Sequence, residues 1–273
     1  MKKIGLAFLG VMDFILKNNM KAIALVFDYD LNKLKSNGRF WADDIYGKSE
    51  SDTFSYSAAS YATFLDKNPE IPLEIYTDNI DKIKSSLKKY KVNLNNVYYF
   101  DITNEIIESN KSKYTFQPIV DLCYKFKNSK EYIIKIDNDL IWNKKIPVLN
   151  EFKDVLVWKF ERYVYQGDPR MGEQLVCEKV CKTINFKEYN IGVMGYPIGY
   201  PMEEFYKTCA DMVEVDILPV SDLGVNVWHC CEQTAQSWII HKFDYNPVET
   251  TDIVNHWYED KFVCIEKAKY LIL

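Results

Sequence analysis

The sequence predicts an α/β fold in which a mixed, mainly parallel sheet is flanked by helices within a single domain. Short apolar segments of strand length alternate with longer segments whose apolar residues recur at helical spacing. Several of the apolar segments stop at Asp, Asn or Thr, as expected where strands reach the polar edge of a parallel sheet. The 273 residues contain no internal repeat and no Pro/Gly/Ser-rich linker, which favours one domain.

The first twenty residues are interpreted as an N-terminal helix packed on the domain formed by residues 21–273. Lys2 and Lys3 precede the apolar run 4–12, which is much shorter than the ~20 residues of a membrane-spanning helix. We therefore expect no transmembrane segment. A helix docked on the surface would leave peripheral membrane association open.

The first half of the chain shows three strands separated by two helices. The run 22–27 (AIALVF) is short and apolar, and 53–65 carries apolar residues at helical spacing. The strand 72–76 stops at Thr77-Asp78-Asn79, where a short amphipathic helix over 80–90 begins. The third strand, 96–100 (NVYYF), follows that helix.

The second half continues the alternation. A helix over 116–126 leads to the apolar strand 132–136 (YIIKI), which runs into Asp137. The apolar runs 155–160 and 191–196 flank a polar middle section. The last expected helices cover 202–213 and begin again at Gln233.

Charge and cysteine content exclude some classes of function. The formal net charge is -5, whereas proteins that follow a nucleic-acid backbone carry a basic surplus, so we expect no nucleic-acid partner. Seven cysteines, an odd number without zinc-site spacing, favour reduced thiols in a cytoplasmic protein.

Asp137-Asn138-Asp139 is the strongest chemical motif. The expected strand delivers two carboxylates, two residues apart, at its C-terminal end. Mg²⁺ and Mn²⁺ prefer carboxylate, phosphate and water oxygens, so this arrangement suits a metal–diphosphate site. The alternative is a turn after a strand, because Asp-Asn also favours turns.

His256 is the candidate third ligand. It follows the apolar pair Ile253-Val254, and neutral imidazole binds divalent metals well. Lys261, five residues later, could neutralise phosphate. The alternative is a histidine packed beside Trp257.

Two further pairs could contact a ligand. Asn190 and Gly192 stand at the start of an expected strand, and glycine permits close approach of a ligand to the backbone. Glu232 and Gln233 open an expected helix, where a carboxylate and an amide could hold sugar hydroxyls. The alternatives are an ordinary strand start and a carboxylate that complements the helix dipole.

Taken together, these motifs resemble the GT-A family of glycosyltransferases over roughly residues 21–261, in the family's order. The resemblance implies a GT-A-type, Rossmann-like domain that uses Mn²⁺ or Mg²⁺ and a nucleotide-sugar donor. It implies metal ligation by Asp137, Asp139 and His256. It implies catalytic roles for Asn190, Glu232 and Gln233. It implies binding of the nucleotide and its diphosphate by Phe27, Asp28, Tyr29, Asp78, Asn138, Gly192 and Lys261.

The His-aromatic…Lys tail is similar to the retaining branch that contains glycogenin and bacterial lipopolysaccharide galactosyltransferases. This chain departs from that branch at Glu232, where Asp is usual, and in a tail without the common Gly and Pro. The resemblance implies sugar transfer to a glycan or other hydroxyl acceptor, in surface polysaccharide or glycoconjugate synthesis. Two alternatives stay open: a nucleotidyltransferase-like enzyme, although no glycine-rich phosphate loop is found, and a non-catalytic sugar-binding protein.

Overall fold

The computed structural model describes residues 19–27, 53–109, 114, 116–166, 173–215, 231–256 and 265–269. The expected N-terminal helix, apart from its last two residues, and the expected roles of Asp28, Tyr29 and Lys261 fall outside these ranges. Met20, assigned above to the N-terminal helix, is the first residue of a strand.

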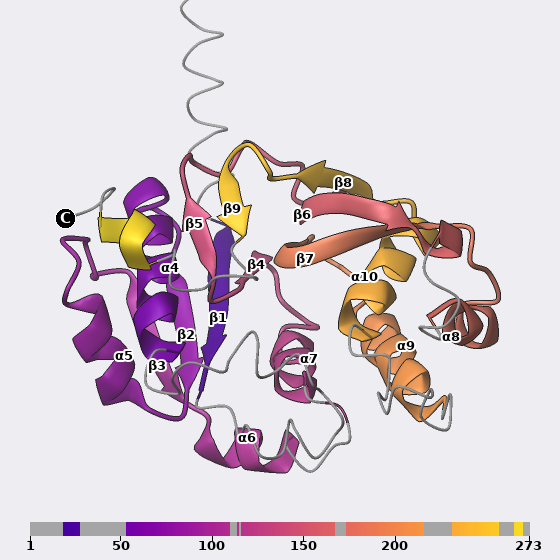
Figure 1. Ribbon diagram of the computed structural model, residues 1–273, viewed down its shortest axis with the longest axis horizontal. Helices are drawn as coiled ribbons and strands as arrows, with labels where there is room; N and C mark the ends of the chain where they lie inside the picture. The colour runs from indigo at the N-terminus through magenta and orange to yellow at the C-terminus, as the bar shows by residue number, and fades with distance from the viewer. Residues whose placement is uncertain are drawn as a thin grey trace, which may run out of the picture.

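A seven-stranded sheet organises the described residues, in the order β3-β2-β1-β4-β7-β6-β8 (Figure 1). Neighbouring strands are parallel except for β4–β7 and β7–β6, so the sheet is mixed and mainly parallel, as the sequence predicts. The strands are β1 Met20–Val26, β2 Leu73–Thr77, β3 Val97–Asp101, β4 Tyr132–Ile136, β6 Asp154–Tyr163, β7 Lys187–Tyr196 and β8 Asn246–Glu249.

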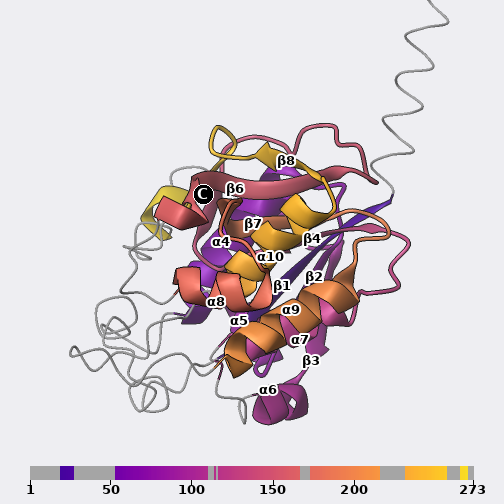
Figure 2. The ribbon, with the colours of Figure 1, turned by 90° about the vertical axis from the view of Figure 1, so that its right-hand side faces the viewer.

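Helices cover both faces of the sheet, and the period-2 alternation of β1 shows why. Ala22, Ala24 and Val26 join one apolar cluster with α4 and α5, while Ile23 and Leu25 join another with helices α6 to α10. Figure 2 shows that second layer, with α8, α9 and α10 in front of the sheet. The labelled helices are α4 Thr53–Lys67, α5 Ile80–Leu87, α6 Thr103–Ser109, α7 Gln117–Tyr124, α8 Glu173–Val180, α9 Met202–Glu214 and α10 Cys231–Lys242, and a further short helix covers 265–269.

A separate two-stranded sheet joins distant parts of the chain. β5 (Leu140–Trp142) pairs antiparallel with β9 (Val254–His256), and Leu140 lies opposite His256. β5 is fixed to α4, because the backbone N–H of Trp142 donates to Thr63 Oγ1 at 3.1 Å. This small sheet, which the sequence analysis did not predict, carries His256 back to the end of β4.

Two expected strands are longer than the sequence indicated. β6 extends to Tyr163 and β7 begins at Lys187, so the two pair antiparallel beyond the apolar runs 155–160 and 191–196 that the sequence indicated. Asn190 therefore lies inside a strand and not at its start. The extension also places Glu161 and Glu188 on paired strands.

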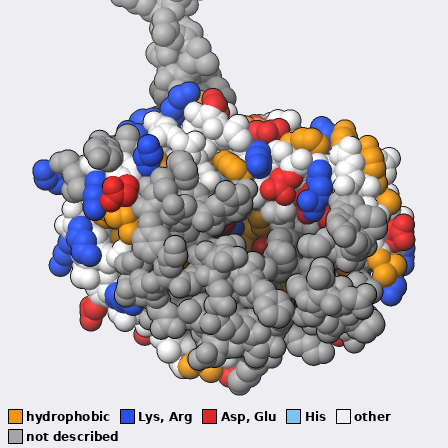
Figure 3. Space-filling view, viewed as in Figure 1, with side chains coloured by type: hydrophobic (Ala, Val, Ile, Leu, Met, Phe, Trp, Pro, Cys, Tyr) orange, Lys and Arg blue, Asp and Glu red, His pale blue; other side chains and the backbone are white. Residues whose placement is uncertain are grey.

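On the described part of the face in Figure 3, acidic and basic side chains are intermixed. Within the described ranges, every helix is too short or too polar to cross a bilayer. The five described cysteines, at positions 123, 177, 181, 209 and 231, are buried and free of disulfides.

Candidate metal and active site

The Asp137–Asp139 segment lies directly after β4, at the edge where the parallel strands β1, β2 and β4 end. Two contacts fix its backbone from opposite sides. The N–H of Asp137 donates to the Gly192 carbonyl at 3.0 Å, and Ser60 Oγ donates to the Asp137 carbonyl at 3.0 Å. Strand β7 and helix α4 therefore hold this segment between them.

Asp137, Asp139 and His256 converge at this edge. Each offers one ligand atom, and the three atoms lie within 4.8 Å of one another. His256 Nε2 is 3.1 Å from Asp139 Oδ1, close to the ~3 Å between adjacent ligands of an octahedral ion with bonds of about 2.1 Å. Two carboxylates and an imidazole form a donor set that fits Mn²⁺ or Mg²⁺ completed by diphosphate oxygens.

Gly192 and Trp158 set the position of the His256 ring. A Cβ on Gly192 would stand 2.7 Å from both Cε1 and Nδ1 of His256, so the ring occupies the space that a side chain would fill. The Trp158 ring meets the imidazole edge-on, with centroids 5.0 Å apart. Gly192 was expected to allow close approach of a ligand; the close approach seen here is by His256.

Lys135 holds the more exposed of the two carboxylates. Its Nζ is 2.6 Å from Asp137 Oδ1 and donates to the Ile191 carbonyl at 2.9 Å, although Lys135 is only 5% exposed. The ammonium offsets one negative charge beside the candidate metal position. Lys135 was not among the predicted site residues, and its signal in the sequence was a single lysine within the apolar strand YIIKI.

Tyr61, also missed, orients the middle residue of the motif. Its hydroxyl donates to Asn138 Oδ1 in a short hydrogen bond. Burial, and to a lesser extent the negative charge of Asp137, raises the pKa of Tyr61 well above its ordinary value, so the phenol stays a neutral donor. The Asn138 carbonyl thus faces α4, and its expected contact with the cofactor remains a prediction.

The expected catalytic residues Asn190 and Gln233 are joined by a carboxylate that the sequence analysis did not select. Asn190 Nδ2 donates to Glu161 Oε1 at 3.0 Å, and Gln233 Nε2 donates to Glu161 Oε2 at 3.2 Å. Glu232 lies in the first turn of α10, where its backbone N–H donates to Tyr114 Oη at 3.1 Å. The missed signal was an acidic residue in the apolar run VLVWKFE.

A buried acidic pair lies behind Gln233. Arg162 places one guanidinium nitrogen 2.7 Å from Glu173 and 2.9 Å from Glu188, and both carboxylates are almost fully buried. Glu188 also accepts from Gln233 Nε2 at 3.4 Å. Burial, followed by the charge of Glu188, raises the pKa of Glu173 to about 7 even though Arg162 opposes that rise.

The other expected nucleotide contacts are only partly described. Phe27 follows β1 and is 4% exposed within the apolar cluster on the α7 face of the sheet. Asp78 follows β2, just before Asn79, whose side chain caps the N-terminus of α5. Both lie at the same sheet edge as Asp137, which agrees with the expected location, and their roles remain predictions.

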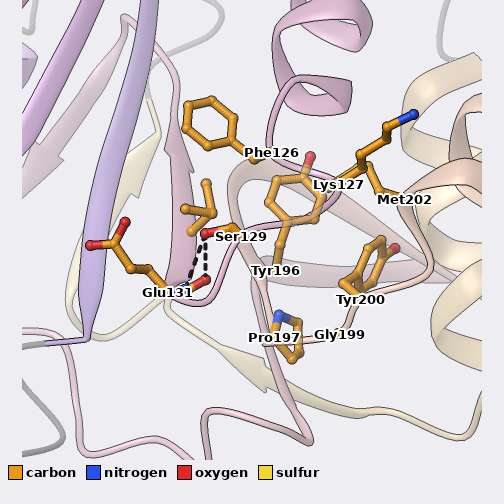
Figure 4. Close-up of a pocket in the computed structure, with 10 residues that line it drawn as sticks. Phe126, Lys127, Ser129, Glu131, Tyr196, Pro197, Gly199, Tyr200 and Met202 are labelled. Carbon is orange, nitrogen blue, oxygen red and sulfur yellow. Dashed lines mark hydrogen bonds between the residues drawn. The ribbon is translucent and has the colours of Figure 1, made fainter.

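Two hollows differ in their relation to this site. Figure 4 shows a pocket near Glu131 and Tyr196, at the opposite edge of the sheet, with a cavity volume of about 10 Å³. That volume admits about one water molecule, which excludes a nucleotide sugar. A second pocket, of about 250 Å³, is lined by Trp158, His256 and neighbouring β9 residues and therefore borders the candidate site.

Comparison with known proteins gives structural similarity only. No protein-family model and no curated protein sequence matches the chain. A solved structure of the galactosyltransferase LgtC with donor and acceptor sugar analogs is 11% identical, with 75% of this chain and 68% of that chain covered and a TM-score of 0.45. A structure of an active-site mutant of LgtC is 12% identical over the same shares, with a TM-score of 0.47. Mouse xyloside xylosyltransferase 1 in its apo form is 12% identical, with 84% of each chain covered and a TM-score of 0.47.

Proposed function

We propose that the protein is a metal-dependent glycosyltransferase that moves a sugar from a nucleoside-diphosphate sugar to a hydroxyl of a glycan or glycoconjugate acceptor, as in surface polysaccharide synthesis. One observation carries the proposal: two carboxylates and an imidazole meet at the strand ends, within 4.8 Å. Asp137, Asp139 and His256 are also the three residues that the sequence motifs predict as ligands. A turn-forming Asp-Asn pair would not require a distant histidine beside it.

The metal ligands and the residues that orient them would have separate roles. Asp137, Asp139 and His256 would hold Mn²⁺ or Mg²⁺, which neutralises charge on a departing diphosphate when bound. Lys135 keeps Asp137 Oδ1 in place, and the Trp158 edge and Gly192 fix the imidazole.

Sugar hydroxyls would bind on the α10 side of the site. The groups available to them there are the amides of Asn190 and Gln233 and the carboxylate of Glu232. We propose the retaining stereochemistry because the His-aromatic…Lys tail, His256-Trp257 and Lys261, is similar to that of the retaining branch. Glu232 and Gln233 are then the groups we place beside the reacting sugar.

A donor-hydrolysis assay tests the proposal against its alternatives. The protein is incubated with a panel of nucleotide sugars and Mn²⁺, and products are identified by ³¹P NMR. Release of nucleoside diphosphate, abolished by EDTA, is the expected result. Pyrophosphate release or exchange would instead indicate a nucleotidyltransferase, and thermal stabilisation without turnover would indicate a sugar-binding protein.

Stereochemistry and location need separate measurements. With an acceptor in hand, the anomeric proton coupling of the first product distinguishes retention from inversion. We also propose a cytoplasmic location, supported by the free thiols of the described cysteines. Fractionation of cells that produce the protein tests it, and recovery only with membranes would favour peripheral association.

A further inference from the structure

We propose that Glu161 is a positioning residue: together with Glu188 it fixes the side-chain amide of Gln233, so that Gln233 presents its carbonyl oxygen as an acceptor for a sugar hydroxyl. The identity of that hydroxyl rests on the proposed function. The orientation of the amide does not, because contacts within the chain determine it.

Glu161 connects the sheet to the helix that carries Gln233. It lies on β6, next to the antiparallel strand β7 that carries Asn190, while Gln233 lies in the first turn of α10. One carboxylate oxygen accepts from Asn190 and the other accepts from Gln233, at 3.0 and 3.2 Å. Both oxygens of Glu161 are therefore used to hold amide N–H groups.

The two carboxylates determine which way the Gln233 amide faces. Its Nε2 lies 3.2 Å from Glu161 Oε2 and 3.4 Å from Glu188 Oε1, and an amide nitrogen has two hydrogens to donate. A flipped amide would place its carbonyl oxygen against two carboxylate oxygens and lose both charge-assisted bonds. The carbonyl is therefore turned away from Glu161 and Glu188.

The surrounding contacts keep this arrangement rigid. Glu188 is 1% exposed and is held by the Thr234 hydroxyl at 2.9 Å and by Arg162. Asn190 is engaged at both ends, since its Oδ1 accepts the Gly192 N–H at 3.0 Å. Gln233, by contrast, is partly exposed.

Kinetics of Glu161→Gln give the first test. This change keeps the shape but replaces one acceptor oxygen with a donor nitrogen, so the Gln233 amide can flip. We expect kcat for Mn²⁺-dependent turnover to fall at least tenfold, with donor KM and Mn²⁺ affinity within twofold of wild type. Glu161→Asp, which keeps the charge on a shorter side chain, should recover part of kcat.

Glu74→Gln is the matched control. Glu74 is also a strand carboxylate that accepts two side-chain hydrogen bonds, from Lys21 and Tyr76, but it lies away from the strand-end site. Its replacement should leave kcat unchanged. A wild-type kcat for Glu161→Gln would overturn the proposal.

An NMR measurement tests the orientation without any turnover. In ¹⁵N-glutamine-labelled protein, the side-chain NH₂ signal of Gln233, assigned by its loss in Gln233→Ala, should show two distinct protons shifted by carboxylate acceptors. Glu161→Gln should move that signal, and Glu74→Gln should not. An unmoved Gln233 signal would overturn the proposal even if kcat falls, because Glu161 would then act by another route.

The kinetic and NMR measurements distinguish failure of the proposed function from failure of the proposed Gln233 orientation. If no nucleotide sugar in the panel is turned over, the proposed function fails while the NMR arm still decides the orientation of Gln233. If Glu161→Gln does not fold by circular dichroism, Glu161→Asp takes its place in the NMR arm. Its shorter side chain should weaken the Gln233 contact and shift the same signal, and an unchanged signal would again overturn the proposal.

Discussion

Gly192→Ala should displace the His256 ring and weaken metal binding while leaving all three candidate ligands in the sequence. The added Cβ would stand 2.7 Å from His256 Cε1 and Nδ1 and 3.2 Å from Cγ. Non-bonded carbon atoms prefer about 3.5–4.0 Å, so the ring must retreat by roughly 0.8–1.3 Å. Ligand distances in metal sites tolerate only about ±0.2 Å.

The expected loss of affinity follows from that mismatch. A residue that orients a metal ligand typically accounts for a 10- to 100-fold difference in metal affinity, which corresponds to about 1.4–2.7 kcal/mol. Calorimetric titration of Mn²⁺ in the presence of a nucleoside diphosphate measures it. In EDTA, overpacking alone should lower the free energy of unfolding by about 1–3 kcal/mol.

Gly195→Ala controls for overpacking in the same strand. Its Cβ would lie 2.0 Å from Tyr132 Oη, so it should destabilise the protein without changing Mn²⁺ affinity in the folded fraction. Gly192→Ala in a His256→Ala background should have no further effect on metal binding, since the ring it displaces is absent. Wild-type Mn²⁺ affinity in Gly192→Ala would refute the proposal that His256 is held as a ligand by this glycine.

Three other changes test the site. Asp139→Asn should lower turnover at saturating donor by at least a hundredfold without unfolding the protein, because the isosteric amide lacks the charge a hard cation needs; unchanged kcat would reject Asp139 as a ligand. A nucleoside diphosphate at ~100 times its Kd should stabilise the fold by about 2.7 kcal/mol with Mn²⁺, and equal stabilisation in EDTA would count against a metal-bridged diphosphate. The pKa of Glu173 is raised from its ordinary value of 4.5 to about 7, so the folded state favours the protonated form. The contribution of Glu173 to the free energy of unfolding should therefore fall as pH rises from 4.5 through about 7 and then level off. Glu173→Gln should remove up to about 3 kcal/mol of that fall, at 1.36 kcal/mol per pKa unit; denaturant unfolding at pH 5 and pH 8 checks it, and identical pH dependence in both proteins would disprove it.

The sequence determined the features that depend on local pattern. Each expected strand from 22–27 to 191–196 appears in the sheet, because a short apolar run and the polar residues that end it are features of a few adjacent residues. The placement of Asp137 and Asp139 at a strand end followed for the same reason. The short strands β5 and β9 were missed because three residues are too few to show a period.

The convergence of the site was decided only by the tertiary structure. His256 meets Asp139 because β9 pairs with β5, and no local pattern links residues so far apart in the chain. Glu161 likewise contacts Gln233 because β6 and β7 pair beyond their apolar segments and α10 packs beside them. Neighbouring residues in the sequence determine whether a segment favours helix or strand and which side chains are buried. Whether side chains from different elements bind one metal or hydrogen-bond to each other depends on the distances between those elements. Packing of the sheet and helices sets those distances.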